Sequence, residues 1–162
     1  MLVSYGLNKG AEYVLVGLLA GISLLIFVQV VFRYGFNHSL FWSEEVGRYT
    51  LVWITFIGAS VGFKRKNHVG VDFLYKAFND HVKLVLTLFS DMVVLVLAFI
   101  LTFYGIRLAK FVRLQTSAAL MLSMSIPYSA IWVGGLLTFF HSLAFLVDDV
   151  EKLVQPKKAG YR

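Results

Sequence analysis

Long apolar stretches alternate with short polar ones along the chain. The first uncharged stretch, residues 13–32, has twenty residues, and a helix of that length crosses a hydrocarbon core of roughly 30 Å. It is longer than the apolar core of a signal peptide, so we interpret it as a retained membrane helix. The second stretch, residues 49–63, has only fifteen residues. Its helix must therefore begin near residues 42–45 in order to span.

The second half of the sequence contains two longer stretches. Residues 84–106 are apolar apart from Asp91, and residues 114–147 form an uncharged run of thirty-four residues. The latter is too long for one straight span. Pro127 can divide it, because proline is tolerated in the first turn of a helix and disrupts its interior. We expect a short interfacial piece at about 114–125, followed by the fourth span.

These patterns predict an all-α membrane protein with four transmembrane helices. No internal repeat, low-complexity segment or linker divides the sequence, so we treat residues 1–162 as a single integral membrane domain. The expected spans are residues 12–34, 43–63, 84–108 and 127–147, each to within a few residues.

A further short helix is expected between the second and third spans. Val71, Leu74 and Phe78 recur there at helical spacing, with Lys76 and Asp80 on the other side. An amphipathic segment of this kind lies in the membrane interface and does not cross it.

The composition agrees with a membrane protein. Hydrophobic residues make up 59% of the chain and charged residues only 15%, against about 25% charged in soluble domains. Fifteen Lys and Arg outnumber nine Asp and Glu, but they lie between apolar stretches and do not form a nucleic-acid-binding patch. With four spans, ten of the fifteen fall on the side of both termini. The positive-inside rule then places both termini in the cytoplasm.

Enzymatic and cofactor chemistry find little support in the sequence. The chain has no cysteine, which excludes disulfides, thiolate catalysis and thiolate metal sites. Its histidines, His38, His68, His81 and His141, form no pair at matching depth on adjacent helices, as haem ligation would require. We therefore expect no cofactor, no metal and no catalytic residues, and we keep a haem-bearing membrane anchor of a redox enzyme as an alternative.

The start of the second span carries a polar cluster. Ser43 could cap this helix. Glu44 and Glu45 lie four and three residues before Arg48, so both carboxylates could reach one guanidinium. Two interpretations stay open: a capped, charge-paired helix start, or a polar contact of this segment, Trp42 included, with a partner or a lipid head group. In both we expect the charges to be paired, because an unpaired charge near the membrane is costly.

Small residues suggest where helices meet. Gly17 and Gly21 lie four apart in the first span, as do Gly58 and Gly62 in the second, and small residues at this spacing let helices approach closely in lipid. The pattern is common in apolar helices and says nothing about a ligand. Trp53, in mid-helix, suggests that protein covers the second span.

Asp91 is an intramembrane acid if the third helix enters the membrane near Leu84, because it would then lie about 10 Å deep. An acid at that depth is a functional candidate. We favour a later entry, which leaves Asp91 near the inner head groups. A transporter working alone should carry more ionisable groups or broken helices near the midplane than this sequence offers.

The second helix and its exit contain three short motifs in order. They are Trp42-Ser43-Glu44-Glu45-x-x-Arg48, Trp53-x-x-Phe56-x-Gly58-Ala59 and Lys64-Arg65-x-x-His68-x-x-Val71-Asp72. Together these motifs resemble the DctQ-like small membrane subunit of tripartite ATP-independent periplasmic (TRAP) transporters. The chain length, the four spans and the basic middle loop fit the same family.

The resemblance implies a division of labour in a bacterial inner membrane. A large membrane subunit would carry the substrate and sodium sites, and a periplasmic binding protein would deliver an organic acid such as a sialic acid or a dicarboxylate. The small subunit would be a scaffold in contact with the large subunit and with phospholipids, with His68 and Asp72 among its interface candidates. An autonomous small exporter is the second alternative.

Overall fold

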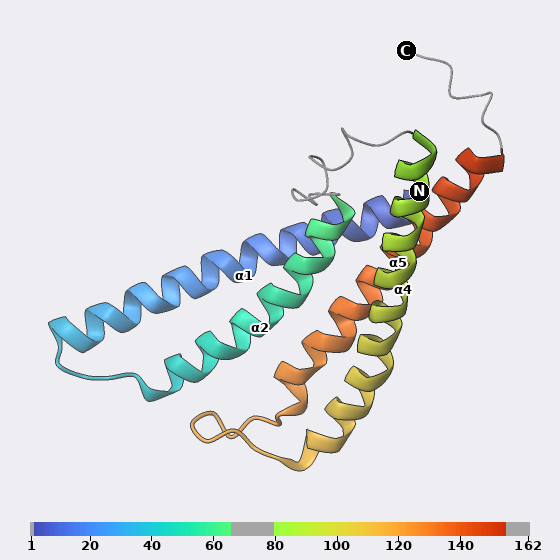
Figure 1. Ribbon diagram of the computed structural model, residues 1–162. Coiled ribbons are helices and arrows are strands. Elements are labelled where there is room, and N and C mark those ends of the chain that lie inside the picture. Colours follow the sequence, from blue (N-terminus) through green and yellow to red (C-terminus); the bar gives the residue numbers. More distant parts are fainter. Residues whose placement is uncertain (1, 66–79, 155–162) are drawn as a thin grey trace.

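The computed structural model describes residues 2–65 and 80–154. Its described part contains four long helices, each long and apolar enough to cross a membrane, which confirms the four expected helices. The interfacial helix expected after the second span falls on residues 71–79, outside the described residues. The long helices are α1 (Leu2–Gly35), α2 (Phe41–Lys64), α4 (Asp80–Phe111) and α5 (Ser125–Val154), and a 3-10 turn, η1 (Val112–Leu114), follows α4 (Figure 1).

The helix bundle has two ends, which we name the connection end and the terminal end. At the connection end, residues 36–40 join α1 to α2 and residues 112–124 join α4 to α5. At the terminal end lie the start of α1, the end of α2, the start of α4 and the end of α5 (Figure 1). The helices extend furthest beyond the expected spans at the terminal end, where α1 begins at Leu2 and α5 continues to Val154. Apolar length sets how much of a helix fits in the membrane, but it does not set where the helix ends.

Adjacent glycines in the middle of α5 bring three helices together. A Cβ atom at Gly134 would lie 2.7 Å from the Cβ of Phe56 in α2, and one at Gly135 would lie 2.9 Å from the Oγ1 of Thr102 in α4. A Cβ at Gly105 of α4 would lie 2.9 Å from a backbone nitrogen of α5. These positions exclude larger side chains, so α2 and α4 pack closely against two sides of α5.

The first helix is much less covered than the rest. It packs on α2 through a small core of Ala11, Ile57 and Val61, which Trp53 and Leu137 border. Only 6% of the most apolar stretch of α1 is buried against the rest of the described chain, whereas 33% of the corresponding stretch of α5 is buried. Helix α1 meets α5 near its N-terminal part and lies far from the α4–α5 pair at its other end (Figure 1).

The α4–α5 connection is an ordered hairpin. An antiparallel bridge joins Thr116 to Ser123, and the N–H of Met124 donates to the carbonyl of Gln115 at 2.9 Å. Pro127 is the third residue of α5, so the break expected there is confirmed. The separate piece expected at about 114–125 consists of the end of η1 and this hairpin, residues 115–124.

Candidate functional site

The carboxylate of Glu45 lies at the connection end, between α2 and the hairpin. The residue is only 4% exposed. Its Oε2 atom accepts hydrogen bonds from the backbone N–H groups of Ala119 and Leu120, both at 2.9 Å, and its Oε1 atom accepts one from the Tyr49 hydroxyl. Amides at the tip of a hairpin have no helical acceptor, and a carboxylate is a strong substitute. We call these four residues the hairpin clamp.

Further bonds make the hairpin a defined shape. The Tyr49 hydroxyl lies 3.3 Å from the sulfur of Met124, where the hairpin meets α5. The N–H of Leu122 donates to the Ser117 hydroxyl at 3.1 Å, and the Ser123 hydroxyl donates to the carbonyl of Arg113 at 2.7 Å. Met121, at the tip, is exposed and has a φ of 53°. The clamp therefore holds an ordered loop with an exposed apolar side chain at the connection end of the bundle.

The prediction that Glu44, Glu45 and Arg48 form a charge-paired cluster is wrong. Neither acid forms an ion pair with Arg48, whereas Arg65 and Glu12 form one at the terminal end, at 3.0 Å. Glu44 and Arg48 are both exposed, whereas Glu45 is turned toward the hairpin. Backbone amides and a tyrosine occupy the Glu45 oxygens, so its charge is satisfied without the guanidinium.

The expected cap of α2 is also wrong. The helix begins at Phe41, two residues before Ser43, with Leu40 at the N-cap position. Ser43 is buried inside the first turn, and its hydroxyl donates to the carbonyl of Leu40 at 2.6 Å. Trp42 lies in the same turn and is 44% exposed.

A second group of buried polar side chains lies at the terminal end. His141 of α5 is fully buried, and its Nδ1 atom lies 2.9 Å from the hydroxyl of Ser4 in α1. Its Nε2 atom has no hydrogen-bond partner among the described residues. The contact fastens the first turn of α1 to α5.

Asp91 lies at the same end of the molecule. It is 6% exposed, and its backbone carbonyl accepts a hydrogen bond from the Ser142 hydroxyl at 2.8 Å. Helix α4 begins well before it, at Asp80, and the candidate span begins at Val85. Asp91 is therefore part of the α4–α5 contact, and its depth in the membrane stays a prediction.

The remaining sequence candidates are dispersed. Trp53 borders the α1–α2 core, so the protein that covers it is this chain itself. A Cβ atom at Gly62 would meet no atom of another described segment within 4 Å, and one at Gly58 would lie 3.7 Å from Leu15, an ordinary contact. Gly17 and Gly21 likewise face open space, so the expected close approach does not occur there within the described chain. His68 and Asp72 lie outside the described residues.

The positions of two histidines argue against a haem between them. His38 lies in the α1–α2 connection and His141 far along α5, toward the other end of the bundle. These two cannot ligate one iron. In residues 2–65 and 80–154, no group of three or more His, Asp or Glu side chains could hold a metal ion.

Sequence reasoning missed the partners of Glu45. The clamp depends on main-chain amides at Ala119 and Leu120, more than seventy residues away along the chain, and backbone donors leave no signature in residue types. One of the partners could have been found from the sequence. Tyr49 follows Glu45 by one turn on the same side of α2, so its hydroxyl can reach the carboxylate.

We compared the sequence of this chain with models of known protein families. Residues 22–152 match the model of the family described as "Tripartite ATP-independent periplasmic transporters, DctQ component". The chain belongs to the DctQ family. As a DctQ protein with four helices long and apolar enough to cross a membrane, it is a multi-pass inner-membrane component of a transporter and not an enzyme.

Individual proteins similar to this chain are also named as TRAP transporter permease proteins. One protein of Haemophilus influenzae, provisionally named a TRAP transporter small permease protein, is 32% identical over 99 residues, which cover 61% of this chain and 62% of that protein. The sialic acid TRAP transporter small permease protein SiaQ of Vibrio cholerae is 26% identical over 148 residues, covering 91% and 86%. The sialic acid TRAP transporter permease protein SiaT of Haemophilus influenzae is 29% identical over 101 residues, covering 62% of this chain but only 16% of that longer protein. The matches thus span less than two thirds of the first and third of these relatives.

Proposed function

We propose that this DctQ protein is the scaffold subunit of a sodium-coupled secondary transporter that imports an organic acid. Its partners are a large membrane subunit, which carries the transport site, and a periplasmic binding protein. Family membership and relatives named for sialic acid transport support the proposal. So does SiaT, in which a segment similar to this chain is one part of a much longer permease.

The hairpin clamp carries the scaffold role. A transport site needs polar atoms that are open to substrate or ion and can exchange them. The buried carboxylate of Glu45 instead bonds to two main-chain amides and a tyrosine of its own chain. An acid used in this way stabilises a fixed surface.

The orientation that we propose puts the connection end in the periplasm and both termini in the cytoplasm, in line with the ten-to-five distribution of Lys and Arg. The hairpin then faces the compartment from which a binding protein arrives. Single cysteines at Asn37 and Asn67 test this in intact cells, because the chain has no cysteine of its own. An impermeant thiol reagent should label Asn37→Cys and spare Asn67→Cys, and the reverse pattern would overturn the orientation.

Reconstitution tests the scaffold role. The large subunit is placed in proteoliposomes with and without this chain, and labelled organic acid, binding protein and a sodium gradient are supplied to both. We expect uptake only when the chain is present, and none when the chain is reconstituted alone. Equal uptake with and without the chain would contradict the scaffold role. Uptake by the chain alone would favour an autonomous transporter.

A further inference from the structure

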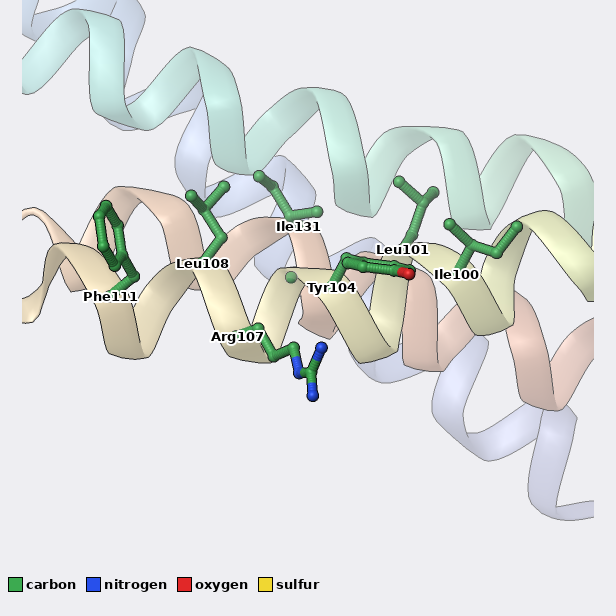
Figure 2. Close-up of a pocket in the computed structure, with 8 residues that line it drawn as sticks. Ile100, Leu101, Tyr104, Arg107, Leu108, Phe111 and Ile131 are labelled. Atoms are coloured by element: carbon green, nitrogen blue, oxygen red, sulfur yellow. The ribbon is translucent and has the colours of Figure 1, made fainter.

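A trough runs along α5 between α2 and α4, close to the connection end. One hollow of about 420 Å³ is bordered by α4, and a second of about 360 Å³ is bordered by α2. Ile131 of α5 lines both hollows, so they adjoin. In Figure 2, Ile131 of α5 and Leu101 and Leu108 of α4 point toward α2. We use the name trough for both hollows together.

The walls of the trough are bulky and apolar. They carry Tyr104 and Phe111 of α4, Val52 of α2 and Tyr128 of α5. The one glycine that lines it, Gly105, is already packed against α5. Helices that associate in membranes do so through small residues that let backbones approach. An uneven surface of large side chains is better filled by a flexible hydrocarbon chain.

A cation stands at the α2 side of the trough. Arg48 lines the smaller hollow and is exposed, and it makes no ion pair with any described residue. Arg107 lines the larger hollow on the α4 side, but its guanidinium lies 4.7 Å from the centre of the Phe103 ring and points away from Ile131 (Figure 2). Of the two arginines that line the trough, Arg48 is therefore the one whose charge is directed to neither a described ring nor a described acid.

The charge of the connection end favours an anionic ligand. Five basic residues lie there against two acidic ones, a net charge of +3, and the oxygens of one acid, Glu45, are occupied by the hairpin clamp. The basic residues are Arg33, Arg48, Arg107, Lys110 and Arg113, and the acidic ones are Glu44 and Glu45. Tyr128, in the first turn of α5, borders the trough, and tyrosines are enriched at the level of lipid head groups.

We propose that the trough binds one glycerophospholipid from the membrane leaflet at the connection end. One acyl chain lies along Ile131 between α2 and α4, and the phosphate group lies against Arg48. This pairing gives the exposed guanidinium a charge-assisted partner at head-group depth. The inference goes beyond the scaffold role and requires only that the chain lies in a membrane.

Cross-linking from the acyl chain tests the site. The full-length chain, alone and in complex with its large subunit, is reconstituted in nanodiscs with phosphatidylglycerol that carries a diazirine in its acyl chain. Mass spectrometry then maps the cross-links. We expect them to concentrate at residues 100–111 and 127–131 in both preparations. Cross-links spread evenly over the exposed side of α4 would mean annular lipid only. Trough cross-links that vanish in the complex would mean that the large subunit fills the trough, and either outcome overturns the proposal.

Matched variants separate filling of the trough from general damage. Ile131→Trp fills the trough, whereas Leu136→Trp adds the same bulk on an exposed part of α5. We expect trough cross-links to fall at least about tenfold in Ile131→Trp and to persist in Leu136→Trp. Equal cross-linking in the two variants contradicts the site. If Ile131→Trp does not fold, Ile131→Phe replaces it, and the wild-type map decides the question independently.

Native mass spectrometry measures the contribution of the cation. Arg48→Gln should bind added phosphatidylglycerol about tenfold more weakly than the wild type. Arg33→Gln removes an arginine from the same end of the molecule and should bind as the wild type does. Unchanged binding in Arg48→Gln, or an equal loss in both variants, would show that Arg48 does not hold the phosphate.

Discussion

The two ends of the bundle bury polar side chains in different ways. At the connection end the carboxylate of Glu45 accepts three hydrogen bonds, two of them from main-chain amides of the hairpin. At the terminal end the imidazole of His141 meets one described partner, the Ser4 hydroxyl. Each side chain fastens another segment to the helix that carries it, the hairpin in one case and α1 in the other.

The difference follows from charge and from backbone geometry. A buried carboxylate needs hydrogen-bond donors, and the amides in the interior of a helix are not available because each is already bonded to the carbonyl four residues earlier. Free main-chain amides are available in non-helical segments such as the hairpin and in the first turn of a helix. An imidazole can be buried neutral and needs fewer bonds, so a hydroxyl from a neighbouring helix is enough. Removing the acid should therefore disturb the molecule most.

Replacing the acid tests the connection end. Glu45→Ala leaves two amides and a tyrosine hydroxyl without their acceptor, and a buried donor without an acceptor is costly. We expect hydrogen exchange at Ala119 and Leu120 to accelerate by at least about a hundredfold, because the hairpin opens locally. Glu44→Ala is the matched control on an exposed neighbour and should leave exchange unchanged. Protection that survives in Glu45→Ala would show that the clamp does not hold the hairpin.

Removing the single described partner of His141 should have a smaller effect. Ser4→Ala leaves the buried imidazole without its hydroxyl and should lower the free energy of unfolding by about 1–2 kcal/mol. His141→Leu in the Ser4→Ala background removes both polar groups and should recover part of the loss. The measurement is reversible unfolding in mixed micelles. Additive effects of the two substitutions would mean that the contact does not fasten α1 to α5.

Loss of the tyrosine hydroxyl should weaken the clamp without opening it. In Tyr49→Phe the carboxylate of Glu45 keeps both amide donors and loses one of its three described hydrogen bonds. We expect exchange at Ala119 and Leu120 to rise about tenfold. Tyr128→Phe, on α5, is the control and should leave exchange unchanged. A change as large as that in Glu45→Ala would show that the tyrosine, and not the acid, holds the hairpin.

The exposed ion pair should contribute least. Arg65 and Glu12 join α2 to α1 at the terminal end and are both accessible to solvent. Exposed pairs contribute about 0–1 kcal/mol, so Glu12→Gln should change the unfolding free energy by no more than that. The effect should also shrink as salt is added. A loss larger than that of Ser4→Ala would reverse the order proposed here.

The sequence predicts the helices well because apolar length is a local property. The fifteen-residue stretch at 49–63 requires an earlier start, and α2 does begin at Phe41. Proline geometry is equally local, so Pro127 correctly marks the start of α5. The family resemblance is confirmed by the match to the DctQ model.

Contacts between helices are much harder to predict. The spacing of Gly17 and Gly21 suggests a close contact, yet both face open space in the described chain, whereas Gly134 and Gly135 are packed against neighbouring helices. Nothing local distinguishes the two pairs, because the partner surface decides which glycine is needed. The pairing predicted for Glu45 and Arg48 fails for the same reason, since the competing amides come from a distant hairpin.

Uptake per assembled complex in Glu45→Gln tests the scaffold account most directly. This substitution removes the charge but keeps a side-chain oxygen that can accept the amide bonds. The complex is purified with its large subunit and counted, and sodium-driven uptake of the organic acid is measured with binding protein present. The account predicts that less complex assembles and that uptake per complex and its sodium dependence are unchanged. Normal assembly with uptake lost, or with sodium dependence altered, would make Glu45 part of the transport site and would contradict the scaffold role.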